Sequence, residues 1–164
     1  MIFLSTFLVS CGVQEHASEG LYQAVDELYA AVFAGTDRFE VIALIDHSRL
    51  AAKEGKLMPP ARAVLFSDPV VNTLILQQEP LAGLDLPFRV LAYAEGGSPA
   101  VIFTTAEFMK RRHDLANGPA MQRYEDAITG VVGTVPAEDM VAMDTSSLGN
   151  GQGIVILKSS YDFD

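Results

Sequence analysis

The sequence predicts a domain in which helices are combined with an antiparallel sheet, and two observations carry this prediction. Two hydrophobic runs, 87–93 and 100–104, are joined by the turn Glu95-Gly96-Gly97-Ser98, which is the pattern of a β-hairpin. Apolar residues recur at helical spacing over 21–32 and 119–132. A chain of 164 residues with one cysteine is the size of a single domain, and it can bury a core without a disulfide.

The first two predicted elements are a helix and a strand. Ser18 is suited to cap the N-terminus of the helix, and Gly35 is suited to end it. The apolar residues on one face of this helix are Leu21, Val25, Leu28 and Val32. Residues 39–45 follow as a strand that is apolar on both faces, so we expect it to be a central strand.

A short polar helix is predicted over 48–56, and a strand over 62–66. Asp68 followed by Pro69 indicates the start of a helix that runs to about residue 78. The carboxylate accepts from open N–H groups there, and proline at the first helical position loses no hydrogen bond. The hairpin described above comes next along the chain.

Two further helices are predicted after the hairpin, over 105–112 and 119–132. Residues 144–152 are rich in Ser, Gly and Asn, which is typical of a linker. One more apolar run follows at 154–157.

The first ten residues carry no formal side-chain charge and are mostly apolar. This run is too short to span a bilayer, which takes about 20 apolar residues, but it suits the apolar part of a signal peptide. Leu8-Val9-Ser10-Cys11 resembles the lipobox of bacterial lipoproteins, whose cysteine takes a diacylglycerol on sulfur. We therefore expect a signal peptide over 1–10, a tether over 11–17, and a lipid anchor at Cys11 on the periplasmic face of the inner or outer membrane.

A second interpretation of the same residues stays open. Residues 2–9 would then form a buried strand of a cytosolic domain, and Cys11 would be an ordinary small core residue. Cell fractionation distinguishes the two interpretations.

The charge balance excludes nucleic acid as an expected partner. The net charge is −10, whereas nucleic-acid binding depends on Lys and Arg side chains that neutralise phosphates. The one basic run, Lys110-Arg111-Arg112, is placed at a helix end, where cations meet the negative end of the helix dipole.

Five short motifs occur in an order that resembles a known family. They are Asp46-His47, Pro59-Pro60-Ala61-Arg62, Phe66-Ser67-Asp68-Pro69, Leu84-Asp85-Leu86-Pro87 and Arg112-His113. Over about 18–132 the chain is similar to the bacterial family called domain of unknown function 302. The resemblance implies an α+β fold with the topology of the TATA-binding protein, in which helices pack on one face of an antiparallel sheet. The family usually has Phe-Gly-Asn-Pro where this chain has Phe66-Ser67-Asp68-Pro69.

The C-terminal residues resemble the way in which members of that family begin. We therefore expect the domain to cover 18–143, a linker to cover 144–152, and a final strand over 153–164 to begin a second repeat. Alternatively, this strand folds back beside residues 39–45 and covers an otherwise open sheet edge. A strand edge is also the natural place for a homodimer or a tandem-repeat partner.

The candidate ligand-binding residues are Asp46, His47, Asp68 and His113. Three of them also have a structural explanation: Asp68 as a helix cap, His113 at a helix end, and His47 in the turn to the next helix. We predict no catalytic residue, no metal site and no cofactor, because neither a phosphate-binding loop nor a nucleophile motif is present.

The sequence therefore favours a non-enzymatic, lipid-anchored envelope domain that binds a small ligand or a protein in a groove between sheet and helices. The alternative is a histidine-dependent enzyme or metal-binding protein that uses His47 and His113.

Overall fold

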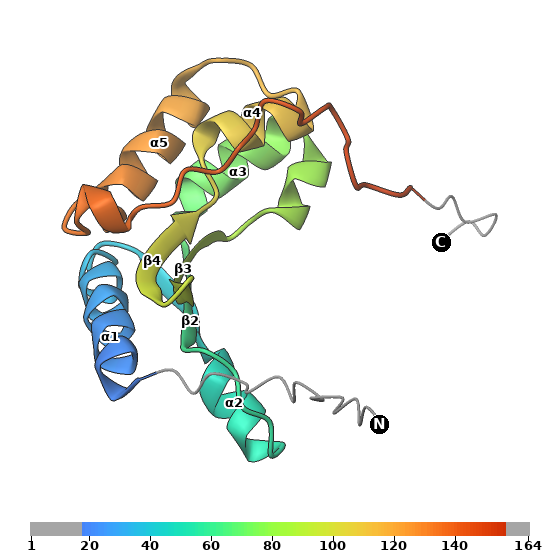
Figure 1. Ribbon diagram of the computed structural model, residues 1–164. Helices are drawn as coiled ribbons and strands as arrows, with labels where there is room; N and C mark the ends of the chain where they lie inside the picture. Colours follow the sequence, from blue (N-terminus) through green and yellow to red (C-terminus); the bar gives the residue numbers. More distant parts are fainter. Residues whose placement is uncertain (1–17, 157–164) are drawn as a thin grey trace, which may run out of the picture.

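A computed structural model describes residues 18–156 and shows an α+β domain (Figure 1). The predicted fold class is confirmed. In chain order the elements are α1 (Glu19–Ala34), β1 (Glu40–Asp46), α2 (His47–Lys53), β2 (Ala61–Ser67), α3 (Pro69–Gln78), the 3-10 helix η1 (Pro80–Leu84), β3 (Phe88–Glu95), β4 (Ser98–Phe103), α4 (Ala106–His113), α5 (Pro119–Val132) and the 3-10 helix η2 (Ala137–Asp139). The predicted signal peptide, the tether and Cys11 lie outside the described residues.

The four strands form an antiparallel sheet in the order β1-β2-β3-β4. The turn between β3 and β4 is a tight hairpin turn, in which Gly96 and Gly97 have φ values of 57° and 85°. Two successive positive φ angles match the twist of the flanking strands and are accessible to glycine at little cost. The hairpin is therefore confirmed.

Within residues 18–156, β1 is an edge strand, so the prediction of a central strand is wrong there. Its apolar residues are not fully covered, since Ile42 is 51% exposed and Leu44 is 49% exposed. The two apolar faces of β1 have separate explanations, and neither requires a second neighbouring strand. Ile45 faces a groove described below, while Leu44 pairs with the core residue Val64.

Helix α1 packs against β2, β3 and β4 and buries one face of the sheet. Ser18 caps this helix as predicted, because its hydroxyl accepts a hydrogen bond from the N–H of Leu21 at 3.3 Å. The buried residues between helix and sheet are Val25, Leu28, Val32, Val64, Val90, Ala92 and Val101. They form a continuous apolar core.

Helices α3, α4 and α5 gather at the end of the sheet where β2 and β4 finish and β3 starts (Figure 1). Aromatic rings connect this group to the sheet: Phe66 stacks on Phe88 with ring centroids 5.0 Å apart, and Phe88 stacks on Tyr124 at 4.4 Å. The Tyr124 hydroxyl donates to the carbonyl of Thr104 at 3.0 Å. Burial raises the pKa of Tyr124 above its usual value, which keeps this donor protonated.

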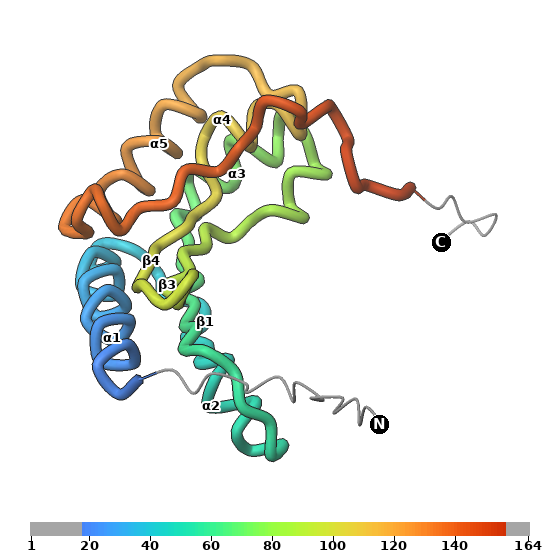
Figure 2. Tube along the Cα trace, in the orientation of Figure 1, coloured from blue at the N-terminus to red at the C-terminus, as the bar shows by residue number. Residues whose placement is uncertain are grey.

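After α5 the chain turns back along the outer side of β4 (Figure 2). Val101 and Met140 form a parallel bridge, and the Val141 N–H donates to the Val101 carbonyl at 2.9 Å. The chain then passes α4, where the Gly151 N–H donates to the Arg112 carbonyl at 2.7 Å. Residues 153–156 form no strand and lie beside η1 and α4, not beside β1, and 157–164 fall outside the described residues.

Candidate functional site

The two predicted histidines line different cavities. His47, the first residue of α2, is exposed and lines a groove on the sheet. His113, the last residue of α4, is buried and lines a cavity of about 190 Å³ together with Arg112 and residues of the C-terminal segment. The structure therefore does not bring His47 and His113 to one cavity. Among residues 18–156, no group of three His, Asp or Glu side chains is placed to hold a metal ion.

Asp46 is occupied by local and long-range partners. Its Oδ1 accepts from the Arg49 N–H and from the Ser48 hydroxyl, both at 2.8 Å, which caps the N-terminus of α2. Its Oδ2 lies 3.2 Å from Nε of Arg62, whose Nη1 contacts Asp26 at 2.9 Å. Burial alone raises the pKa of Asp46, but these hydrogen bonds and the Arg62 charge outweigh burial and lower it.

The buried carboxylate of Asp85 connects His113 to Arg112. Nε2 of His113 lies 2.6 Å from Oδ2 of Asp85, and Nη1 of Arg112 lies 3.3 Å from Oδ1. The His113 side chain is 1% exposed and that of Asp85 is 11% exposed. We name these three residues the Asp85 cluster. It joins α4 to the segment between η1 and β3.

Asp68 has the role that its place before proline predicted. Its Oδ1 accepts from the N–H groups of Val70 at 2.9 Å and Val71 at 3.2 Å, at the start of α3. It also borders a cavity of about 300 Å³ with the cations Arg38 and Arg123. Asp126 supplies a second carboxylate there, so the charges in this cavity balance.

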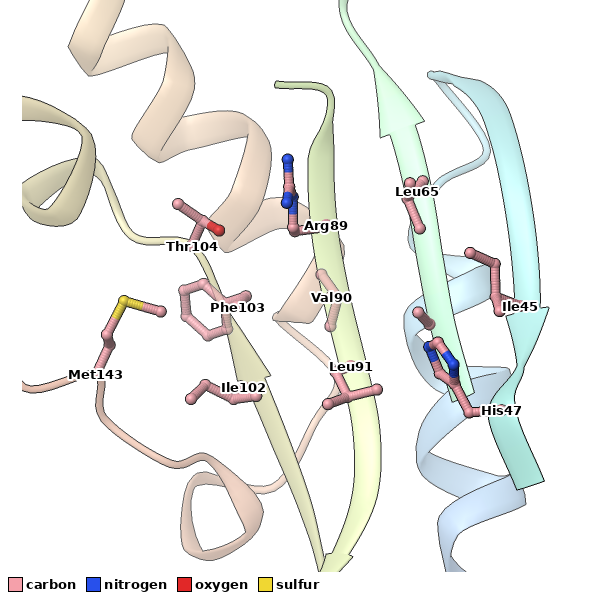
Figure 3. A pocket seen from close by; sticks show the side chains of 11 residues that line it. Ile45, His47, Leu65, Arg89, Val90, Leu91, Ile102, Phe103, Thr104 and Met143 are labelled. Carbon is pink, nitrogen blue, oxygen red and sulfur yellow. The ribbon is translucent and has the colours of Figure 1, made fainter. Parts of the chain in front are cut away.

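An apolar groove of about 350 Å³ lies on the sheet (Figure 3). We name it the open-face groove, and its lining residues are Ile45, His47, Ala63, Leu65, Arg89, Val90, Leu91, Ile102, Phe103, Thr104 and Met143. The pairs Ile45–Ala63, Ala63–Leu91 and Leu91–Ile102 are direct neighbours across the strands. Side chains alternate between the two faces of a strand, so the side chains of these four residues point away from α1, while that of Val64 points toward it.

Polar groups lie at both ends of the open-face groove. Figure 3 shows Arg89 and Thr104 at one end of the groove and His47, Leu91 and Ile102 toward the other, with His47 on the β1 side and Ile102 on the β4 side. Arg89 is exposed, and its Nη2 donates to the Leu84 carbonyl at 3.2 Å. Among residues 18–156 no carboxylate forms an ion pair with Arg89. The groove thus combines an apolar floor with a cation that is available to a ligand.

Sequence reasoning included His47 but missed the rest of this groove. The signal was present in β3, where Leu91 interrupts the alternation that a strand with one solvated face shows. Sequence reasoning also did not pair the motifs it had found. Asp46 meets Arg62, and Asp85 meets His113, each across two motifs that are distant in sequence.

Comparison with known proteins shows the family to which this chain belongs and a solved structure with the same fold. Residues 14–135 match the family described as "Domain of unknown function DUF302". The chain belongs to the DUF302 family. A crystal structure of an uncharacterized conserved DUF302 protein from Bacillus stearothermophilus has the same fold, with a TM-score of 0.53 and 14% identity. That similarity covers 66% of this chain and 88% of the other.

Three curated relatives are named as fluoride-specific ion channels. FluC 1 of Brucella suis is 35% identical to this DUF302 chain over 77 residues, which is 46% of this chain and 30% of the relative. FluC 1 of Brucella abortus and FluC 2 of Brucella melitensis match with the same identity over 77 residues, and 28% of each is covered. This chain therefore spans less than a third of their length. Within residues 18–156, none of the helices combines the length and apolar character that crossing a membrane requires.

Proposed function

We propose that this DUF302 chain is a lipid-anchored, non-enzymatic binding module of the cell envelope, and that its ligand site is the open-face groove. The observation that carries the binding role is the groove itself. Ligand sites in proteins are concave, mostly apolar and bordered by a few polar groups, with volumes from about 300 Å³ upward. The open-face groove, at about 350 Å³, has this character.

The energetics favour an apolar ligand in this groove. Ile45, Leu65, Leu91 and Ile102 are only partly buried and lie side by side on one face. Covering apolar surface stabilises a complex by roughly 25 cal/mol per Å², before the entropy cost of binding is subtracted. A ligand that covers these side chains thus gains affinity from surface that the fold leaves in water.

Two independent observations support the envelope location. The run that ends in Leu8-Val9-Ser10-Cys11 has the pattern of a lipoprotein signal. The Brucella relatives are named as ion channels, and channels operate in membranes, so a related segment occurs within a membrane protein. A lipid on Cys11 would place this module at a membrane surface.

The groove is tested with decanol, an uncharged apolar probe, by isothermal titration calorimetry on the full chain. We expect wild type to bind and Leu91→Glu to lose binding, because the charge enters the groove floor. Leu76→Glu, in α3 and already 37% exposed, is the matched control and should bind as wild type does. Equal binding by wild type and Leu91→Glu contradicts the proposal.

The anchor is tested by the intact mass of the chain recovered from bacterial membranes. We expect a mass that corresponds to a chain beginning at diacylated Cys11, and we expect Cys11→Ser to abolish that species. A chain that keeps Met1 and carries no lipid contradicts the envelope assignment. Residues 1–10 would then belong to a cytosolic protein.

A histidine-dependent reaction is the second candidate, and one contact favours it. In enzymes whose general base is a histidine, a carboxylate that contacts the imidazole ring fixes the orientation of the ring. Asp85 contacts His113 in the same way, at 2.6 Å. This candidate predicts that His113→Ala removes an activity. The structural role predicts a lower melting temperature with unchanged ligand binding.

A further inference from the structure

We infer that the open-face groove selects a single-chain amphiphile with a carboxylate head, and that Arg89 binds this head. The inference rests on the proposed function, because it needs the groove to be a ligand site. It adds the chemical class of the ligand and the residue that recognises it. Three features of the groove carry it: its cation, its floor and its length.

The cation is Arg89, and it is placed to meet a ligand. Its side chain lies at one end of the groove in Figure 3 and is exposed. Its hydrogen bond to the Leu84 carbonyl at 3.2 Å uses Nη2 and leaves other guanidinium N–H groups for a ligand. A planar guanidinium matches a carboxylate in two parallel hydrogen bonds, and a single positive charge balances a single negative one.

The floor of the groove next to Arg89 is apolar. Leu65, Leu91 and Ile102 come from three adjacent strands, and Met143 borders them from the C-terminal segment. These side chains can cover an alkyl chain but offer no partner for a second polar group. A ligand that is polar throughout would lose hydrogen bonds to water there without replacing them.

The length of the floor fits a medium alkyl chain. His47 follows the pair Asp46–Arg62, which aligns with Ala92 on β3, so His47 lies about four residues along and two strands across from Arg89. Strand rise and spacing give a diagonal of roughly 17 Å between these positions. An extended alkyl chain of about ten carbons stays within such a span, so the groove can hold one such chain along its diagonal.

The overall charge makes the role of Arg89 local. With a net charge of −10, the protein repels anions at long range, so a small anion without an apolar chain gains little. The carboxylate head and the alkyl chain of the ligand must therefore both contribute to the binding free energy. We therefore expect affinity for decanoate to exceed affinity for acetate and for decanol.

The test compares decanoate with decanol, which has the same chain length but no charge, by calorimetry on the full chain. We expect Arg89→Met to weaken decanoate binding about tenfold or more, the usual loss when a charged hydrogen bond is removed, and to leave decanol binding unchanged. Arg89→Lys should recover part of the affinity. Arg123→Met, an exposed arginine of α5 outside the groove, is the matched control.

The outcomes separate the two proposals. If decanol and decanoate bind wild type equally, or if Arg89→Met leaves decanoate binding unchanged, the carboxylate inference is wrong while the groove remains a ligand site. If neither probe binds, both proposals fail. Binding only to vesicles that contain phosphatidylglycerol, with no affinity for monomeric decanoate, also overturns the inference, because the ligand would then be a membrane surface.

Discussion

At the scale of the single residue, ionisable side chains pair with partners that are distant in sequence. Asp85 and His113 lie 28 positions apart, with the β3–β4 hairpin between them, yet their side chains meet at 2.6 Å in a buried position. Asp46 meets Arg62 across β1 and β2. The candidate residues His113 and Asp46 therefore both have structural partners within the fold.

The Asp85 cluster predicts a large stability loss when its carboxylate is removed. Asp85→Ala leaves Arg112 and the buried His113 without their acceptor, and removal of one partner from a buried ion pair costs about 3–5 kcal/mol. We expect a loss at the lower end of this range, because Arg112 is partly exposed. Urea denaturation measures it. Glu107→Ala, which breaks exposed ion pairs on α4, is the control and should have a much smaller effect.

The lowered pKa of Asp46 predicts a pH-dependent contribution to stability. Because the pKa is lower in the folded than in the unfolded state, the charged carboxylate stabilises the fold fully above its unfolded pKa of about 3.9. This contribution is lost as the pH falls through the folded pKa. Asp46→Asn keeps an acceptor for the helix cap but loses the charge, so we expect it to cost about 0.5–1 kcal/mol at pH 7 and nothing at low pH.

Denaturation curves at several pH values, repeated in an Arg62→Met background, check this prediction for Asp46. The cost of Asp46→Asn should fall in that background, since the partner cation is gone. A cost that is the same at pH 7 and at pH 2 would show that the charge of Asp46 contributes nothing.

At the scale of the element, local sequence signals determine most helices and the hairpin. Helix α5 begins and ends where the sequence predicts, because Pro119 starts it and its apolar face repeats at helical spacing. The strand β1 shows where such signals fail. Apolar residues on both faces predict full burial, but the number of neighbouring strands depends on the rest of the chain, and β1 has one neighbour within residues 18–156.

The β3–β4 turn predicts a specific cost for a side chain at Gly97. Its φ of 85° lies in the left-handed region, where an added Cβ costs about 1–2 kcal/mol. We expect Gly97→Ala to lower the free energy of unfolding by about this amount. Gly20→Ala, in α1 with nothing within 4 Å of the added Cβ, is the matched control and should hold or raise stability. Equal effects of the two substitutions would contradict a turn-specific origin.

At the scale of the whole molecule, helix α1 covers one face of the sheet, and the open-face groove occupies the other. The sequence predicted the α+β class and placed the ligand groove between sheet and helices, whereas the apolar groove lies on the face turned away from α1. On the α1 side Val25 and Phe66 are fully buried at 0% exposure, while Leu44 at the β1 edge stays 49% exposed. The position of the groove depends on which face of the sheet α1 covers, and this is decided by contacts between α1 and strands that are distant in sequence.

The proposal of a binding module therefore depends on this one face, and nuclear magnetic resonance of methyl-labelled protein during a decanoate titration tests it most directly. We expect the methyl signals of Leu65, Leu91 and Ile102 to shift with increasing decanoate, because these side chains form the groove floor. Ile75 and Ile128, buried in the core, should stay unchanged. Shifts confined to residues outside the groove, or no saturable shift at all, would contradict the account.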